Sequence, residues 1–420
     1  MVKNNIKVAF FVKKGMDDFL NDIIKGLSLN YKVRKIEVTN LFQINEGMEW
    51  ADICWFEWCD DIIAYASDLE LAKRKKIICR LHRYEIFTEY PFIVKWENID
   101  KLVVVLDHVK KLLKEFLPDI EQRVSIETIS NPVNLDLFSF QPREKGYNLA
   151  YIAKVRLIKN PMMILQIIKK LVEFDPRYKL FVAGKFYENL IELYWNHLID
   201  EMNLKDHVYF EGWQKDINKW LENKDYIIST SVYESFGYNI AEGMAKGIKP
   251  VIHNFPTAKD IWSEKYLFNT IDEALEMIKS AEYNSTEYRD FVKRHYSLEK
   301  QIKKIDKMIK GLEKTSKKHV EDTLNEKKVD LILFGASTLG KVAFEILKRK
   351  YCIAYFCDND KRKWGKKINN VEIKSPDYLK ENYKRDKNEV IITSSYYGEI
   401  SKQLTEMGIN QFKVFQTTLQ

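Results

Sequence analysis

Residues 226–254 read YIISTSVYESFGYNIAEGMAKGIKPVIHN, and this stretch is the most informative part of the chain. The stretch YIISTS at 226–231 predicts a buried strand, and small and apolar residues from Tyr238 onward predict a helix after a polar loop. The run KPVIHN at 249–254 predicts another strand. Because parallel strands are joined by helical crossovers, this order of strand, helix and strand indicates a parallel sheet.

The same alternation continues through all 420 residues, so we expect an α/β protein built from doubly wound parallel sheets. We expect a first domain at 1–140, a second at 141–313, a charged linker at 314–328 and a third, smaller α/β domain at 329–420. The expected strands are IKVAFFV, KVRKIEV, DICWFEW, KKIICRLH, KLVVVL and SIETIS in the first domain, NLAYIA, YKLFVAG, VYFEG, YIISTS and KPVIHN in the second, and VDLILFG, CIAYFCD, EVIITS and QFKVF in the third.

The composition is that of an ordinary globular chain, with 45% hydrophobic and 31% charged residues. A net charge of +7 is too dilute for the dense basic face of a nucleic-acid binder. The N-terminus carries only a short apolar run, and no later run approaches the ~18 residues of a spanning helix, so we expect a cytoplasmic protein. The five cysteines contain no CxxC pair, which favours buried thiols over disulfides or a zinc site: Cys54, Cys59, Cys79, Cys352 and Cys357.

Two glutamates flank the loop and helix start in the quoted stretch. Glu234 lies in the loop after the strand, and Glu242 lies eight residues further on, within the helix. The residues between them supply backbone N–H groups at a helix N-terminus, which suit a phosphate or a sugar hydroxyl: Ser235, Phe236, Gly237, Tyr238 and Asn239. Two solvated carboxylates are the alternative, and the pair alone does not decide between them.

The spacing E-x7-E, followed by a small-residue helix and a strand, resembles retaining glycosyltransferases of family 4, and this resemblance covers residues 1 to about 312. YIAKVRLIKNP at 151–161 resembles the start of that family's second domain, with Lys154 in place of its arginine and Lys159 matching its lysine. The resemblance implies that these two cations grip the donor diphosphate; two solvated lysines are the alternative. Further donor-side matches are Gly184 in LFVAG, Trp213 in VYFEGW and Gly15 after the first strand.

The resemblance also concerns the first domain, where IICRLHRYE places His82 directly after a strand. The family keeps a histidine there facing the sugar, although a lone histidine is more often structural. Polar neighbours are expected on the acceptor side: Arg80, Arg83, Tyr84 and Glu85.

The implied fold is GT-B, with two doubly wound domains facing a cleft and the helices after 285 bracing the second domain against the first. The implied activity is the transfer of a hexose-type sugar from a nucleotide sugar to a hydroxyl acceptor, with retention of configuration and without a metal. We expect a UDP-sugar as donor rather than a GDP-sugar. The acceptor would be a glycan, a lipid-linked molecule or a protein, in the synthesis of a polysaccharide or another surface glycan. Glu234 would support the reacting sugar, and Glu242 would bind the ribose. Helix dipoles and cations would replace a metal at the diphosphate.

The third domain opens with FGASTLG, in which Gly335 and Gly340 flank a loop that enters a helix, and Asp358 follows 18 residues after Gly340. This resembles a dinucleotide-binding fingerprint with Ser337 at the middle glycine, and small Rossmann-like domains appended to sugar-modifying enzymes. Because a side chain at 337 crowds a pyrophosphate, we expect a scaffold for docking or homo-oligomerisation rather than a working NAD(P) site.

Two other functions stay open from the sequence. One is a non-catalytic nucleotide-sugar or glycan-binding protein, and the other is an NAD-dependent sugar-modifying enzyme that uses the third domain. The lysine-rich stretch HVKKLLKEFL at 108–117 predicts a solvated helix face, with peripheral contact to the inner face of an anionic membrane as the alternative.

Overall fold

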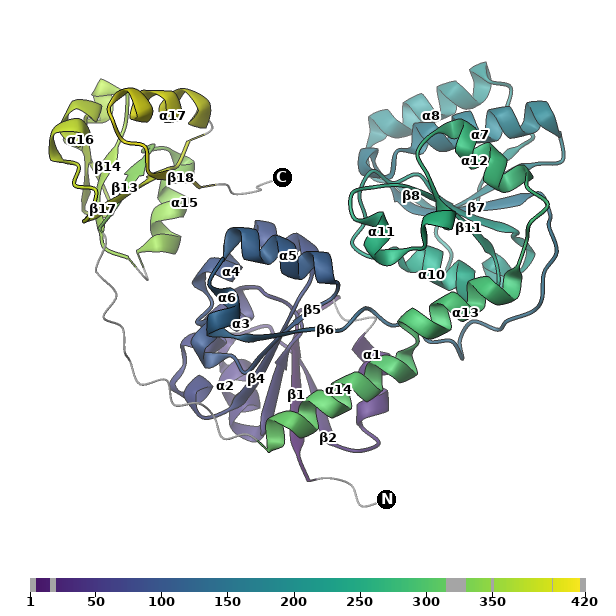
Figure 1. The fold of residues 1–420 in the computed structure, drawn as a ribbon, viewed down its shortest axis with the longest axis horizontal. Coiled ribbons are helices and arrows are strands. Elements are labelled where there is room, and N and C mark those ends of the chain that lie inside the picture. Colours follow the sequence, from purple (N-terminus) through teal and green to yellow (C-terminus); the bar gives the residue numbers. More distant parts are fainter. Residues whose placement is uncertain (1–4, 16–19, 315–329, 349–350, 395, 416–420) are drawn as a thin grey trace. The chain divides into compact units, whose positions relative to one another are not determined.

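The computed structural model describes residues 5–15, 20–314, 330–348, 351–394 and 396–415. These residues form three six-stranded sheets, each covered by helices (Figure 1). The predicted linker at 314–328 lies, apart from Lys314, outside the described residues. The exact domain boundaries therefore stay a prediction.

The first sheet has the strand order β2-β1-β3-β4-β5-β6 and contains all six strands predicted for it. The strands are β1 (Lys7–Val12), β2 (Lys32–Glu37), β3 (Ile53–Phe56), β4 (Lys76–Leu81), β5 (Lys101–Val104) and β6 (Ser125–Thr128). The helices are α1 (Leu20–Leu27), α2 (Leu41–Trp50), α3 (Asp61–Asp68), α4 (Tyr90–Ile93), α5 (Asp107–Phe116) and α6 (Ile120–Arg123). β1, β3 and β4 are buried almost throughout, as expected for strands covered on both faces.

The second sheet has the order β12-β11-β10-β7-β8-β9. Five strands were predicted: β7 (Asn148–Val155), β8 (Lys179–Phe186), β9 (Val208–Phe210), β10 (Tyr226–Ser229) and β11 (Lys249–His253). The sixth, β12 (Leu267–Phe268), has two residues and is too short for a recognisable pattern. In Figure 1 the helices α7 (Pro161–Phe174), α8 (Asn189–Glu201) and α12 (Ile271–Lys279) lie on one face of this sheet, and α10 (Tyr238–Ala245) lies on the other. The short helices are α9 (Ile217–Trp220) and α11 (Ala258–Ile261).

Two consecutive helices, α13 (Ser285–Tyr296) and α14 (Leu298–Glu313), follow the second sheet. α14 packs against α1 of the first sheet, where the Tyr31 hydroxyl donates to Asp306 Oδ1 at 2.7 Å. The packing is close, since a Cβ on Gly26 would lie 2.2 Å from Ile302 Cδ1. The chain therefore returns to the first sheet after completing the second.

The third sheet has the order β15-β16-β14-β13-β17-β18, and its four predicted strands are present: β13 (Asp330–Phe334), β14 (Ile353–Cys357), β17 (Asn388–Ile392) and β18 (Phe412–Val414). The sequence did not predict the antiparallel hairpin of β15 (Lys367–Ile368) and β16 (Val371–Lys374). Its turn residues Asn369 and Asn370 have φ of 48° and 68°, the left-handed values that a two-residue hairpin turn requires. The helices are α15 (Thr338–Leu347), the unpredicted α16 (Pro376–Asn382) and α17 (Tyr397–Glu406).

The cysteines are free thiols, and four of the five are buried as expected. Cys352 is exposed, because it lies just before β14 rather than within it. Within the described ranges, no helix is long and apolar enough to cross a membrane.

Candidate functional site

The candidate site lies where β10 passes into α10. Gly237 ends the connecting loop with φ of 89°, a left-handed conformation that glycine adopts without strain, and α10 begins at the next residue. Phe236 anchors the loop, because its buried ring packs against Tyr238, Trp262 and Tyr296 with centroid distances of 5.1, 6.0 and 4.9 Å. The neighbouring Ser235 is exposed. The loop is thus fixed by aromatic packing on one side and opens to solvent on the other.

Two of the predicted site residues meet in this loop. The Lys159 ammonium forms an ion pair with Glu234 Oε1, although the two residues are 75 positions apart. Ser231 donates its hydroxyl hydrogen to the same carboxylate oxygen at 2.8 Å. Both charged side chains are largely buried, with 23% of the lysine and 12% of the glutamate exposed, so their attraction is screened less than that of a surface pair.

The backbone that carries Lys159 is fixed to the end of β10. Lys159 ends a 3-10 turn after β7, and Asn160 follows with φ of 46° before α7 begins. Thr230 donates its hydroxyl hydrogen to the carbonyls of Lys159 at 2.9 Å and Asn160 at 3.0 Å. The Tyr151 hydroxyl donates to the Lys159 carbonyl at 2.8 Å. Sequence reasoning missed Thr230, Ser231 and Tyr151, and the only available signal was that two hydroxyl residues end a strand.

Glu242 lies in α10, and Asn239 precedes it by less than one turn. Burial raises the pKa of Glu242 from 4.5 to about 7. Asn239 donates from Nδ2 to the carbonyl of Ile152 at 3.0 Å and so ties the start of α10 to β7. Glu242 thus titrates near neutral pH on a helix that is held against the sheet.

Lys154 and Gly184 lie at the carboxyl ends of β7 and β8. Lys154 is exposed and pairs in register with Lys185 on β8, so two cations lie side by side at this edge. Gly184 has φ of 148°, and a Cβ there would lie 1.8 Å from the Ala153 carbonyl oxygen. The backbone packing of the two strands therefore requires a glycine at this position. Trp213 directly follows Gly212, whose carbonyl accepts from the Gly184 N–H at 2.8 Å, and the Trp213 side chain is exposed.

In the first sheet, the residues predicted for the acceptor side lie at the carboxyl end of β4: Arg80 is within the strand, and the others directly follow it. His82 and the side chains of Arg80, Arg83 and Glu85 are buried, whereas Tyr84 is 49% exposed. Burial raises the pKa of the Glu85 carboxyl well above its ordinary value, and Glu85 Oε2 accepts from the backbone N–H of His82 at 2.8 Å. His82 Nε2 and Arg80 Nη1 contact Glu57 Oε1 at 3.0 and 3.2 Å. Sequence reasoning missed Glu57, although it directly follows the apolar strand β3.

Gly15 lies in the turn after β1 with φ of 77°, and a side chain there would have open space around it. Gly15 thus lies in a loop that follows a strand of the first sheet, whereas Lys159 and Glu234 lie in loops that follow strands of the second sheet. Among the described residues, no group of three or more His, Cys, Asp and Glu side chains could hold a metal ion.

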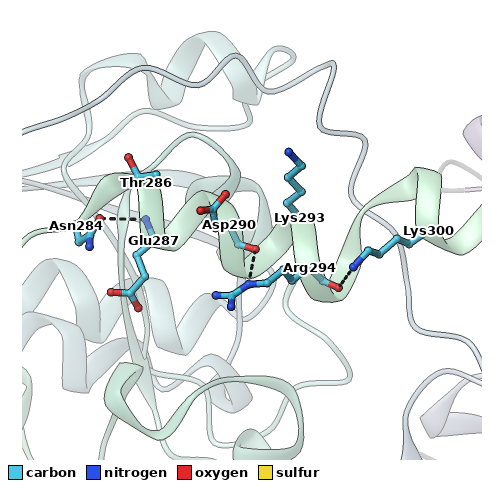
Figure 2. A pocket seen from close by; sticks show the side chains of 7 residues that line it. All are labelled: Asn284, Thr286, Glu287, Asp290, Lys293, Arg294 and Lys300. Carbon is cyan, nitrogen blue, oxygen red and sulfur yellow. Dashed lines mark hydrogen bonds between the residues drawn. The ribbon is translucent and has the colours of Figure 1, made fainter.

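A separate hollow of about 560 Å³ lies along α13 and the start of α14, as Figure 2 shows. Its lining side chains are polar or carry charges of both signs: Asn284, Thr286, Glu287, Asp290, Lys293, Arg294 and Lys300. The contacts drawn there join neighbouring turns, such as Arg294 Nε to the Asp290 carbonyl at 3.3 Å. None of the candidate site residues lines this hollow, and we interpret it as a solvated groove along the two helices.

In the third sheet, Asp358 already has partners within the protein. Its Oδ2 accepts from the Ala336 backbone N–H at 2.7 Å and from the Lys363 ammonium at 2.9 Å. A Cβ on Gly340 would lie 1.9 Å from the Gly335 carbonyl oxygen, so packing of the loop alone requires that glycine. Asp358 and Gly340 thus both contribute to the packing of the domain itself, whereas the Ser337 side chain is exposed.

Comparison with known proteins finds matches for two parts of the chain. Residues 134–298 match the family model described as Glycosyl transferases group 1, and residues 325–415 match the model described as C2185-like, N-terminal. The putative glycosyltransferase EpsD of Bacillus subtilis (strain 168) is 31% identical over 103 residues, which cover 24% of this chain and 26% of EpsD. The GDP-mannose:cellobiosyl-diphosphopolyprenol alpha-mannosyltransferase of Xanthomonas campestris is 24% identical over 134 residues, 31% of this chain and 35% of that protein. The matched part of this chain spans 26–42% of the length of the curated relatives that it matches.

Solved structures extend the likeness to both large domains. Anabaena Alr3699/HepE in complex with UDP and glucose has a TM-score of 0.58 at 13% identity, covering 73% of this chain and 100% of that chain. A glycosyltransferase from Rickettsia africae ESF-5 has a TM-score of 0.58 at 17% identity, covering 74% and 100%. The likeness confirms the expected GT-B fold, followed by a third sheet domain. The relation of that third domain to Rossmann-like domains stays a prediction.

Proposed function

We propose that this protein is a retaining glycosyltransferase that moves a hexose-type sugar from a nucleoside diphosphate sugar to a hydroxyl acceptor. The observation that carries the proposal is the Lys159–Glu234 pair at the carboxyl end of β10, beside the N-terminus of α10. A cation, a carboxylate and helix N–H groups together suit a sugar diphosphate. The match of residues 134–298 to Glycosyl transferases group 1 supports the same assignment.

In the proposed mechanism Lys159 leaves Glu234 and binds the donor diphosphate, where negative charge grows as the bond to the sugar breaks. Lys154, at the exposed end of β7, adds a second positive charge. Glu234 is then free to accept hydrogen bonds from the sugar hydroxyls and to stabilise the positive charge that develops on the ring. Cations and the α10 dipole make a metal unnecessary in this scheme.

The acceptor attacks from the face that the leaving phosphate occupies, and the phosphate oxygen takes the acceptor proton. The new bond therefore has the configuration of the old one. No side chain is required as the base. Glu242 binds the ribose hydroxyls through its carboxylate, and the residues after β4 in the first sheet contact the acceptor.

We propose UDP-sugars as the first donors to test, because the similar HepE structure contains UDP and glucose. GDP-sugars are the second class, since the Xanthomonas relative is named for GDP-mannose. That relative's name also supports a lipid-linked glycan as the acceptor, which would bring the protein to the inner face of a membrane. The third domain would act in assembly, as a homo-oligomer contact, or in docking.

To test the proposed function, the full chain is incubated with UDP- and GDP-sugars, and the released nucleoside diphosphate is measured. Turnover that falls about 100-fold in Lys159→Ala supports the proposal. Tight binding without turnover would favour the second candidate, a non-catalytic nucleotide-sugar-binding protein. If the protein neither binds nor turns over any donor, that result contradicts the assignment of the second domain.

A further inference from the structure

A buried carboxylate with three partners lies at the carboxyl edge of the first sheet. Glu57 follows β3 directly, and its side chain is fully buried. Oε2 accepts from Trp55 Nε1–H at 2.9 Å, while Oε1 accepts from Arg80 at 3.2 Å and lies 3.0 Å from His82 Nε2. Burying an ion pair costs several kcal/mol per ion, and well-packed apolar residues are often as stable. Stability alone therefore does not explain this cluster.

The cluster fixes the protonation of the His82 ring. A carboxylate opposite an arginine only accepts hydrogen bonds, so Nε2 of His82 carries the hydrogen and donates it to Glu57. The His82 side chain in turn accepts from the backbone N–H of Glu85, which agrees with a lone pair on Nδ1. Burial lowers the pKa of His82, which keeps the imidazole neutral. Both ring nitrogens are thus engaged within the protein.

His82 in turn forms the base of an aromatic stack. The Trp58 ring lies on it with a centroid distance of 4.1 Å and an interplanar angle of 28°. The Tyr84 ring lies 5.7 Å from Trp58 and is tilted from it by 45°. Trp58 is buried and Tyr84 is half exposed, so this aromatic cluster reaches solvent at Tyr84. Flat aromatic rings beside a few fixed polar groups are typical of sites that bind small ligands with an apolar face, as a hexopyranose has.

We propose that the Tyr84 ring, supported from behind by Trp58, is a platform for the acceptor hexopyranose, and that Glu57 is a positioning residue that holds this platform through His82. This inference rests on the proposed transferase function. It assigns the substrate contact after β4 to the Tyr84 ring rather than to the imidazole of His82. Arg80 has a supporting role, because it neutralises the buried Glu57.

The platform is tested by saturation-transfer NMR on the full chain with the methyl hexopyranosides of glucose, galactose and mannose. We expect saturation of the ring protons of at least one sugar, its loss in Tyr84→Ala and its retention in Tyr84→Phe, which keeps the ring. Tyr84 is half exposed, so neither change should affect folding. No saturation with any of the sugars, unchanged saturation in Tyr84→Ala, or loss in Tyr84→Phe would each overturn the platform.

The role of Glu57 is tested on the nitrogen-15 NMR spectrum of His82 and on sugar affinity. We expect the wild-type ring to carry its hydrogen on Nε2. The paired variant Glu57→Gln with Arg80→Met removes both buried charges, and we expect it to fold, to show both tautomers and to bind the sugar about tenfold more weakly. If it does not fold, Glu57→Asp replaces it with the same expected loss of affinity.

A hydrogen on Nδ1 in the wild type, or wild-type sugar affinity in a folded Glu57 variant, would overturn the positioning role. Release of nucleoside diphosphate from nucleotide sugars is measured on the same samples. Failure of that turnover in the wild type counts against the proposed function. Normal turnover combined with unchanged sugar binding in the variants counts against this inference alone.

Discussion

Thr230 donates a hydrogen bond to the Lys159 carbonyl at 2.9 Å, while the next residue, Ser231, donates one to the carboxylate of Glu234 at 2.8 Å. Two adjacent hydroxyls at the end of β10 thus hold the two members of one ion pair. Thr230 fixes the backbone on the lysine side, and Ser231 fixes the side chain of the glutamate. The position of the ion pair therefore depends on the two residues that directly follow β10.

We expect Thr230→Val to lower the free energy of unfolding by about 1–3 kcal/mol, because two carbonyls lose a buried hydrogen-bond donor. Donor turnover should fall as well, since the Lys159 backbone loses its support. Thr230→Ser keeps the hydroxyl and serves as the matched control. Urea unfolding and steady-state kinetics measure both effects, and equal behaviour of the two variants would contradict the role of this hydrogen bond.

Glu234→Gln should lower kcat about 100-fold or more with little change in donor KM, because the lost charge acts at the reacting sugar. The variant also breaks the ion pair and releases Lys159. Calorimetry should therefore show UDP binding at least as tight as in the wild type. Weaker UDP binding together with normal kcat would mean that Glu234 holds the nucleotide instead. Ser231→Ala should show a smaller fall in kcat in the same direction.

Donor affinity should depend on pH through Glu242, whose pKa burial raises to about 7. The ionised carboxylate is the form that accepts hydrogen bonds from two ribose hydroxyls, so donor KM should rise as the pH falls below about 7. Glu242→Gln should bind the donor weakly at every pH. A wild-type KM that stays constant between pH 6 and 8 would contradict the ribose assignment.

The raised pKa of Glu242 also makes the stability of the folded protein depend on pH, in the direction opposite to donor affinity. A folded-state pKa of about 7 lies above the ordinary value of 4.5, so ionisation of Glu242 disfavours the folded state as the pH rises from 4.5 through 7. Glu242→Gln should therefore be more stable than the wild type at pH 8 and similar to it at pH 4.5. Thermal unfolding at the two pH values measures the difference, and a stability gain confined to low pH would be inconsistent with this assignment.

Gly184→Ala should lower the free energy of unfolding by about 2 kcal/mol or more, because the new Cβ would lie 1.8 Å from the Ala153 carbonyl oxygen at a φ of 148°. Gly311→Ala, in α14 with open space around it, is the control and should stay within about 1 kcal/mol of the wild type. Denaturant unfolding compares them. If the two variants were equally stable, the close approach of β7 and β8 would be in doubt.

Asp358→Asn should destabilise the third domain, since the Ala336 N–H and Lys363 both bind this carboxylate. The expected loss is about 1–3 kcal/mol. Asp377→Asn, at an exposed position, is the control. Calorimetric titration with NAD should show no tight binding to the full chain, because the carboxylate that would bind a ribose is engaged. Tight NAD binding would contradict this reading of Asp358.

The sequence allowed the large features of the fold to be predicted because buried parallel strands are near-continuous apolar runs. It missed β12 and the β15–β16 hairpin, because β12 and β15 have only two residues each and β16, with the sequence VEIK, alternates with charged residues instead of forming an apolar run. Glu234 and Lys159 were identified together through a family resemblance, and their ion pair spans 75 positions. Glu57 was missed because a buried carboxylate and a solvated one look alike in sequence, and its partner Arg80 lies 23 residues away.

The return of α14 to α1 has a consequence for synthesis on the ribosome. Tyr31 and its partner Asp306 are 275 positions apart, and translation at roughly 5–20 residues per second separates their appearance by roughly 14–55 s. During that interval the α1 surface around Gly26, which Ile302 later covers, faces the solvent of the cell. The nascent chain thus carries an uncovered apolar surface until nearly the whole of the second domain has emerged, which is a surface that holding chaperones recognise.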